Sequence, residues 1–186
     1  MKIAIVGSHG VGKTSLMSKM ENDVYFCDYT FYPEAVREVS RLGFPYNEAS
    51  TDSSQLAMLA LHLLHVEHDT DMVTDRFIVD GLIYSQILRS KGSEISKDCI
   101  DILRTYWDKY KDKIDLYVYC PAEWEIKNDN FRMTDTYMRD MVSTLMLAQL
   151  YMDIPKEKFL IVHGETDQRK EQVKAYVKAL RGELNV

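Results

Sequence analysis

The sequence predicts a three-layer α/β fold, in which helices cover both faces of a five-stranded parallel sheet. Short apolar runs alternate with helical stretches along the whole chain, and the connections between the runs are long. Parallel strands need such long crossovers, which are usually helices. A glycine-rich segment, 7–14, also joins the first apolar run to the first helical stretch. Because ligands of open parallel sheets bind beyond the carboxyl ends of the strands, we expect the functional residues directly after the strands.

The first third of the chain supplies two of the predicted strands. Residues 2–6 form the first strand, which is apolar from position 3 on, as a strand covered on both faces should be, and a helix follows over 13–21. The segment Asp-Val-Tyr-Phe-Cys predicts a second strand over 23–27. A helix over 33–41 starts at a proline and ends before Gly43, the usual places for these two residue types.

The middle of the chain predicts two helices on either side of a short strand. Segment 51–54 offers helix caps, and the helix over 55–66 is apolar almost all round, so we expect it to be largely buried. Residues 72–75 form the third strand. A further helix opens at Asp80 and continues to about residue 91, where Gly92 stops it.

The last third of the chain completes the alternation. Residues 96–111 place apolar side chains on one helical face, and residues 116–120 form the fourth strand, which Pro121 closes. The remaining elements are a helix over 135–152, a fifth strand over 159–162 and a final helix over 168–181.

The composition predicts an ordinary soluble globular protein. The chain has 186 residues, 46% hydrophobic and 28% charged, which predicts a single domain over 1–186. The net charge of -6 disfavours a broad surface for nucleic acid or anionic membranes. No apolar run approaches the length of a membrane span, and the first strand begins too early for a signal peptide. We therefore expect a cytoplasmic protein without a membrane partner; nothing in the sequence indicates an oligomeric state.

The glycine-rich segment Gly-Ser-His-Gly-Val-Gly-Lys-Thr (7–14) matches the phosphate-binding pattern G-x-x-x-x-G-K-[ST], in the strand–loop–helix context that this pattern requires. Glycines let backbone N–H groups turn toward phosphate oxygens, and the following helix adds the positive end of its dipole. The alternative is a glycine turn without a ligand. The pattern predicts a nucleotide site formed by Gly7, Ser8, His9, Gly10, Val11, Gly12, Lys13, Thr14 and Ser15.

Charged residues follow the third strand, where the fold predicts ligand contacts. Asp75 can hold Mg²⁺ together with the Thr14 hydroxyl, and Arg76 can bind an anionic group of a substrate. The alternative is a salt-bridged strand end. Asp80 is either a further polar group of the same cleft or the N-cap of the next helix.

Three residues between the first helix and the third strand are candidates for contact with a second substrate. Glu34 lies one helical turn before Arg37, and its carboxylate can accept the proton of an attacking hydroxyl; the alternative is a surface ion pair. Gln55 can present its amide to a substrate base or can form a helix-end hydrogen bond.

Arginines in the second half of the chain indicate a lid and a nucleotide contact. Arg132 and Arg139 flank the region between the fourth strand and the long helix, and the stretch 128–132 is polar and turn-forming. We therefore predict a lid over about 121–134 that neutralises charge on a reacting phosphoryl group. The alternative is that both are solvated. Arg169 follows the fifth strand, where it can pack against a nucleotide base. His62, His65 and His68 have helical spacing but no acidic or cysteine partner, and we interpret them as structural.

Four segments resemble the small P-loop kinases of nucleosides and nucleotides: GSHGVGKT (7–14), PEAVREV (33–39), TDRFIVDGLIY (74–84) and NFRMTDTYMRD (130–140). Segment 163–169 is compatible. The nearest group contains nicotinamide-riboside kinase domains and related P-loop ATPase domains, with deoxynucleoside and thymidylate kinases further away. The sequence has Asp-Arg-Phe at 75–77 instead of the Glu-Arg-Ser of many deoxynucleoside kinases.

The resemblance implies a P-loop NTPase fold and Mg²⁺-dependent phosphoryl transfer from ATP to a nucleoside, nucleotide or related small acceptor. Lys13 would bind the β- and γ-phosphates, and Thr14 would ligate Mg²⁺. Asp75 would hold Mg²⁺ or serve as the base. Arg132 and Arg139 would be the lid arginines.

Three other functions fit the phosphate-binding pattern. A small GTPase would carry N-K-x-D and a D-x-x-G after the third strand, but the sequence has no such tetrapeptide and Ile78 stands where the glycine would be. A P-loop ATPase would hydrolyse ATP and act on a protein partner. A DNA-directed kinase would act on a flipped modified base, although the negative charge disfavours a large DNA surface.

Overall fold

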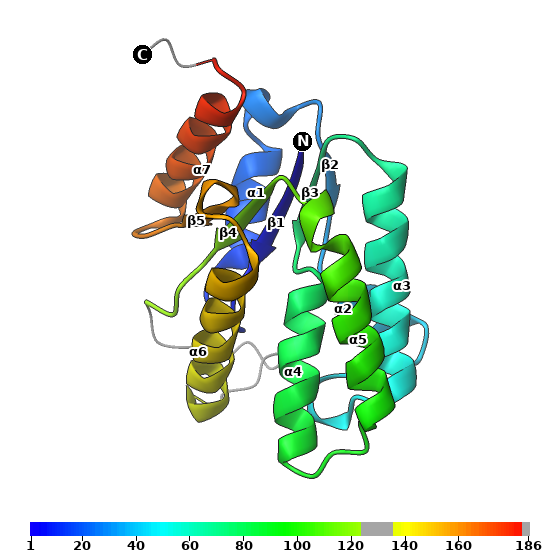
Figure 1. The fold of residues 1–186 in the computed structure, drawn as a ribbon. Helices are drawn as coiled ribbons and strands as arrows, with labels where there is room; N and C mark the ends of the chain where they lie inside the picture. The colour runs from blue at the N-terminus through cyan, green and yellow to red at the C-terminus, as the bar shows by residue number, and fades with distance from the viewer. Residues whose placement is uncertain (124–135, 184–186) are drawn as a thin grey trace.

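The computed structural model describes residues 1–123 and 136–183. Its sheet has five parallel strands in the order β2-β3-β1-β4-β5, which confirms the predicted sheet (Figure 1). The glycine-rich segment follows the central strand of the five. The strands are β1 (Lys2–Val6), β2 (Thr30–Tyr32), β3 (Met72–Asp75), β4 (Leu116–Tyr119) and β5 (Phe159–Ile161).

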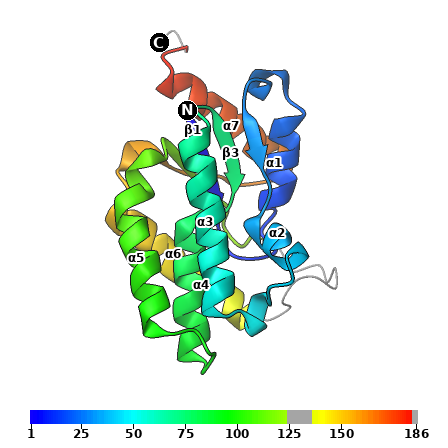
Figure 2. The same cartoon turned by 90° about the vertical axis from the view of Figure 1, so that its right-hand side faces the viewer.

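Helices cover both faces of the sheet, as Figures 1 and 2 show from two directions, and this confirms the three-layer prediction. α1 and α7 pack together on one face, and α3, α4, α5 and α6 form the layer on the other. The short α2 packs against α3. The helices are α1 (Lys13–Glu21), α2 (Ala35–Arg41), α3 (Asp52–His68), α4 (Ile78–Ser90), α5 (Lys97–Tyr110), α6 (Thr136–Asp153) and α7 (Thr166–Leu180).

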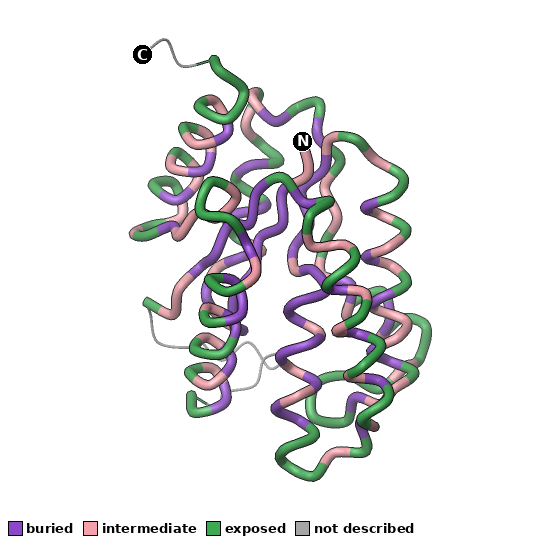
Figure 3. The backbone as a smooth tube through the Cα atoms, in the orientation of Figure 1, coloured by how far each residue is buried: buried purple, intermediate pink, exposed green. Residues whose placement is uncertain are grey.

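The central strand explains why both layers form. Successive side chains of a strand point to opposite faces. Ile3 and Ile5 therefore pack into the core beneath α1 and α7, while Ala4 and Val6 pack into the core beneath α3 to α6. All four are fully buried, and the strands run through the buried middle of the molecule in Figure 3. The strand thus faces two separate cores, which explains why residues 3–6 are all apolar.

The second strand lies elsewhere than predicted. Residues Val24–Phe26 form a 3-10 helix, because the Asp23 carboxylate accepts a hydrogen bond of 2.9 Å from the Tyr25 N–H and closes a local turn. Val24 is 83% exposed, which a strand covered on both faces would not allow. The real β2 lies further along, at Thr30–Tyr32, and pairs with β3 through Met72–Thr74.

Helix α4 begins two residues before the predicted Asp80. Phe77 is its N-cap, and the Asp80 carboxylate accepts the Phe77 N–H at 3.2 Å, so this carboxylate caps the helix from inside its first turn. Of the described helices, none combines the length and apolar character that crossing a membrane would need.

Candidate functional site

The glycine-rich loop leaves β1 and enters α1 with backbone angles that need glycine. Gly12 is the N-cap of α1 and has a φ of 87°. At Gly7 a Cβ atom would lie 2.6 Å from the carbonyl oxygen of Cys120, at the end of β4. The loop therefore packs directly on a neighbouring strand, and a side chain at Gly7 would push it away.

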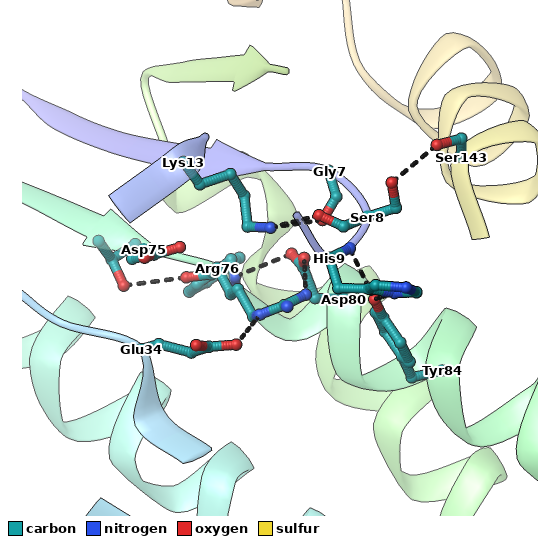
Figure 4. Close-up of polar contacts among 12 residues, drawn as sticks. Gly7, Ser8, His9, Lys13, Glu34, Asp75, Arg76, Asp80, Tyr84 and Ser143 are labelled. Carbon is teal, nitrogen blue, oxygen red and sulfur yellow. Dashed lines mark hydrogen bonds and ion pairs between the residues drawn. The ribbon is translucent and has the colours of Figure 1, made fainter. Parts of the chain in front are cut away.

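Lys13 is buried beneath this loop. Its ammonium group donates hydrogen bonds to the carbonyl oxygens of Gly7 at 2.9 Å and Ser8 at 2.6 Å (Figure 4). Burial lowers the pKa of Lys13, and the nearby Arg76 guanidinium lowers it further, while Asp75 opposes this. The side chain is thus held at the loop by main-chain acceptors that a bound phosphate can replace.

Thr14 and Asp75 form the second part of the site. The Thr14 hydroxyl donates a hydrogen bond of 2.6 Å to Asp75 Oδ2. The other carboxylate oxygen, Oδ1, is buried and has no hydrogen-bond partner within the described residues. Burial raises the pKa of Asp75, and the charge of Lys13 opposes that change. A hydroxyl and a carboxylate oxygen lacking a partner are the oxygen donors that Mg²⁺ takes in proteins, so these residues fit that ion.

Arg76 connects three elements of the site. It has a φ of 79°, a left-handed conformation that is unusual outside glycine, at the turn between β3 and α4. Its guanidinium forms an ion pair with Glu34, at the start of α2, and donates to Asp80 Oδ1 at 3.1 Å (Figure 4). The salt bridges that the sequence offered as an alternative interpretation are therefore present at the end of β3. It holds the cation in one place between two carboxylates.

The two carboxylates around Arg76 have opposite pKa shifts. Burial would raise the pKa of Glu34, but the charges of Arg76 and Lys13 hold it below its usual range. Burial raises the pKa of Asp80 to about 6, although Arg76 and Lys13 oppose this rise. Glu34 is therefore ionised at neutral pH, whereas Asp80 titrates nearer to neutrality.

Tyr84 of α4 joins this cluster to the glycine-rich loop. Its hydroxyl accepts a hydrogen bond of 3.0 Å from the His9 N–H, and the Arg76 guanidinium lies 5.2 Å from the centre of its ring. Nothing in the sequence singles out Tyr84 as a site residue, because one tyrosine in an apolar helix carries no functional signal.

Two cavities meet at this cluster. One lies along the glycine-rich loop and is lined by Lys13, Thr14 and Asp75 among others. The second encloses about 650 Å³ including the open solvent at its mouth, and its walls, from α2, α3, α4 and α5, are mostly apolar. The residues that line both cavities are Glu34, Asn47, Arg76 and Tyr84.

The remaining predicted site residues differ in whether they line a cavity. Gln55 lines the second cavity and is buried, whereas Arg37 is exposed on α2 and lines neither cavity. Ser15 is exposed in the first turn of α1. Arg139 lies one turn before Ser143 of α6, whose hydroxyl contacts the Ser8 hydroxyl at 2.9 Å. Arg132 and positions 124–134 of the predicted lid lie outside the described residues.

Arg169 is placed differently from its prediction as a base contact. Only 1% of it is exposed, and its guanidinium donates to the Val11 carbonyl and to the Gly164 carbonyl, both at 2.8 Å. A third hydrogen bond, also 2.8 Å, reaches Glu123. Arg169 thus supports the glycine-rich loop from the protein interior.

A glycine-rich loop between the central strand and α1, with Lys13 and Thr14 behind it and Asp75 on the adjacent strand, defines a P-loop NTPase. Residues 2–169 match the family model described as an AAA domain. The chain belongs to this family. No curated protein sequence matches the chain.

Solved structures of several proteins share the fold. A NadR protein in complex with NR matches with a TM-score of 0.75 and 17% identity, over 99% of this chain and 52% of that one. The chain thus spans about half the length of the NadR protein. The M. mycoides deoxyadenosine kinase matches with a TM-score of 0.68 and 14% identity, over 96% of this chain and 100% of that one. The Candida albicans thymidylate kinase matches with a TM-score of 0.67 and 13% identity, over 99% of this chain and 94% of that one. At these identities the likeness shows the fold.

Proposed function

We propose that the protein transfers the γ-phosphoryl group of ATP to a nucleoside, nucleotide or related small acceptor, with Mg²⁺. The observation that carries the proposal is the meeting of two cavities at Glu34, Arg76 and Tyr84. An ATPase without a small acceptor needs only the cavity along the loop. A second, largely apolar cavity that opens on the same charged cluster supplies a place for an acceptor beside the transferred group.

The ATP phosphates bind in the glycine-rich loop. Backbone N–H groups from Gly10 to Ser15 and the positive end of α1 would face the triphosphate, and Lys13 would exchange its two carbonyl acceptors for phosphate oxygens. Because Lys13 is buried, its charge acts on the phosphates with little screening by water.

Thr14 and Asp75 hold Mg²⁺ when it is bound. The Thr14 hydroxyl and Asp75 Oδ1 are the donors available for the ion. The ion neutralises charge on the phosphate oxygens. Asp75 is therefore assigned to the metal, and its hydrogen bond with Thr14 keeps both donors side by side.

Glu34 is the base in this proposal. It lines both cavities, and Arg76 holds its carboxylate in place. The acceptor hydroxyl oxygen forms a bond to the γ-phosphorus as its proton passes to Glu34, and the bond from that phosphorus to the bridging oxygen breaks, so that ADP leaves with the electron pair. The low pKa of Glu34 makes it a weak base but keeps it ionised, which suffices for a loose, metaphosphate-like transition state.

Arginines complete the site on the side of α6. The contact between Ser143 and Ser8 brings the first turns of α6 beside the loop (Figure 4). Arg139 belongs to that part of the helix. Arg139, together with Arg132 of the lid, would stabilise charge on the phosphoryl group during transfer. Gln55 would contact the base of the acceptor, and Asp80 would orient Arg76 toward it.

The similar proteins support an acceptor of the nucleoside or nucleotide type. One NadR structure contains NR and another contains NAD and AMP-PNP. The deoxyadenosine kinase was solved with dCMP and dCDP as products.

The test is a search for phosphorylated product. The protein is incubated with Mg·ATP and, separately, with nucleosides, nucleotides and short DNA, and mass spectrometry looks for an acceptor about 80 Da heavier, one added phosphoryl group. We expect a small acceptor to gain that mass. The Lys13→Ala variant should keep its fold and lose about three orders of magnitude in kcat/KM.

The other outcomes identify the competing functions. Release of phosphate without a heavier acceptor would indicate an ATPase, and a heavier oligonucleotide would indicate a DNA-directed kinase. Turnover of GTP but not ATP would indicate a GTPase. Normal ATP turnover by Lys13→Ala would contradict the assignment of the loop.

A further inference from the structure

Two polar side chains of α3 that line the second cavity each carry a buried atom with no hydrogen-bond partner among the described residues. Gln55 is 3% exposed and His62 is 7% exposed, and both line this cavity. Within the described part of the chain, neither Gln55 Oε1 nor His62 Nδ1 has a hydrogen-bond partner, and both atoms are buried. Buried polar atoms are nearly always satisfied in folded proteins, so such a pair in one cavity indicates a group that arrives from outside.

The geometry of α3 sets the spacing of the two groups. They are seven residues apart, which is two helical turns and roughly 10 Å of rise on the same helix face. Met58 and Leu59 line the cavity between them, and the Phe77 ring lies 5.7 Å from the His62 ring at a steep angle. A ligand here meets one hydrogen-bonding group at each end of an apolar wall.

Both groups are neutral at physiological pH. Burial lowers the pKa of His62 to about 3, and the charges of His65 and Arg76 lower it in the same direction. Gln55 has no charge to offer. The wall between α3 and α4 therefore attracts neither a phosphate nor a carboxylate, and it suits an uncharged ligand with hydrogen-bonding atoms.

We propose that His62 is a specificity-determining residue of the acceptor site, where its imidazole hydrogen-bonds a neutral heterocyclic group of nucleobase type that also contacts Gln55. The inference rests on the proposed function, which it refines by assigning the heterocycle end of the acceptor to α3. The hydroxyl end then lies toward Glu34 and Arg76, where the two cavities meet.

His65 provides a matched comparison on the same helix. Its Nδ1 is also buried and also has no hydrogen-bond partner among the described residues. Its ring, however, stacks on Tyr32 with centres 3.7 Å apart and 14° between the planes, and it does not line the cavity. Replacing either histidine by leucine removes an imidazole nitrogen without a partner, but only the change at His62 alters the cavity wall.

The test compares His62→Leu, His62→Asn and His65→Leu. Adenosine, cytidine, uridine and nicotinamide riboside serve as acceptor probes with Mg·ATP, and the Tm of each ligand-free variant is measured. His62→Leu should raise the acceptor KM at least about tenfold with little change in kcat, because a contact made equally in the ground state and transition state affects binding alone. The same variant should raise Tm, since it removes a buried group without a partner.

The two other variants separate a ligand contact from a structural role. Asn carries a polar atom close to the position of Nδ1, so His62→Asn should keep the KM within about threefold of the parent. His65→Leu should leave the KM unchanged. An unchanged KM in His62→Leu, an equal rise in His65→Leu, or a rise in His62→Asn as large as in His62→Leu would each overturn the proposal.

Calorimetric binding of the same four nucleosides, without ATP, separates this inference from the proposed function. If the parent protein binds a nucleoside and His62→Leu binds it at least about tenfold more weakly, the inference holds even where no phosphoryl group is transferred. If the parent protein binds none of the four, the inference fails whatever the loop does with ATP.

Discussion

The Thr14 hydroxyl lies 2.6 Å from Asp75 Oδ2, although 61 residues separate the two along the chain. Parallel pairing of β1 with β3 places Ile5 opposite Asp75 and so brings the end of β3 beside the start of α1. The sheet register thus builds the pair, and the second carboxylate oxygen has no partner within the described residues.

Asp75→Asn should remove the effect of Mg²⁺ while leaving ATP binding by the loop largely intact. The amide keeps an oxygen but loses the charge that the ion requires. We expect Mg·ATP and ATP with EDTA to raise Tm by the same amount in this variant, and kcat to fall about 100-fold or more. Thr14→Ser, which keeps the hydroxyl, is the control and should retain the larger shift with Mg²⁺. A full Mg²⁺-dependent shift in Asp75→Asn would show that the carboxylate does not serve the ion.

Asp80 should make stability depend on pH in a defined window. Burial raises its pKa from 3.8 to about 6, so the folded state keeps a proton that the unfolded chain has lost. Stability from this group is complete below about pH 4 and falls as the pH rises to about 6, by about 3 kcal/mol. The free energy of unfolding of Asp80→Asn minus that of the parent should therefore increase across this window.

Urea unfolding at several pH values from about 3.5 to 7.5 measures that difference. Taking the difference cancels the carboxylates with lowered pKa, such as Asp52 and Asp69, which change stability in the opposite direction in both proteins. A difference that stays flat or decreases with pH would mean that Asp80 is ionised throughout the window.

The sequence was sufficient where one local pattern determines the structure. The loop at 7–14, the apolar run of β1 and the alternation of strands with helices predicted the fold, because each depends on neighbouring residues alone. The strand expected at 23–27 was wrong because the Asp23 carboxylate accepts a hydrogen bond from the Tyr25 N–H and closes a turn there. β propensity reflects how side chains pack on a sheet, and it does not include side-chain hydrogen bonds to the backbone that compete with strand pairing.

The candidate site was less predictable, because its polar groups meet through tertiary packing. Glu34 and Arg37 were equivalent candidates one turn apart, yet only Glu34 reaches Arg76 and the two cavities. His62 and His65 were interpreted alike, and only the packing of α3 against α4 and α5 puts His62 on a cavity wall. No periodicity in the sequence distinguishes these neighbours.

Gly7→Ala should destabilise the protein far more than Gly43→Ala. Both glycines have positive φ, but a Cβ at Gly7 would lie 2.6 Å from the Cys120 carbonyl oxygen, whereas nothing lies within 4 Å of one at Gly43. Gly43→Ala should cost about 1 kcal/mol from backbone strain alone. Gly7→Ala should cost about 3 kcal/mol or more, because the loop must move off β4. Equal losses in chemical unfolding would mean that the loop can shift without resistance.

Arg169→Lys tests whether Arg169 acts on the nucleotide through the loop or through the base. The guanidinium holds the Val11 carbonyl, the Gly164 carbonyl and Glu123 at once, and a lysine ammonium cannot reproduce this planar fork. We expect the free energy of unfolding to fall by about 2–4 kcal/mol. Since the proposed function puts the phosphates and not the base in the glycine-rich loop, ATP and inorganic triphosphate should both bind more weakly, by the same factor.

Calorimetry with both ligands distinguishes the two roles, and Arg181→Lys is the control. Arg181 is the C-cap of α7, and its guanidinium binds Tyr29 and Asp71, neither of which belongs to the glycine-rich loop. Replacing Arg181 therefore tests whether a general loosening of α7 is enough to weaken ligand binding. It should lower stability without changing affinity for either ligand. If Arg169→Lys weakened ATP but not triphosphate, Arg169 would instead contact the base, as its position after β5 first indicated. The burial of its guanidinium, 1% exposed beneath Val11, favours the equal loss.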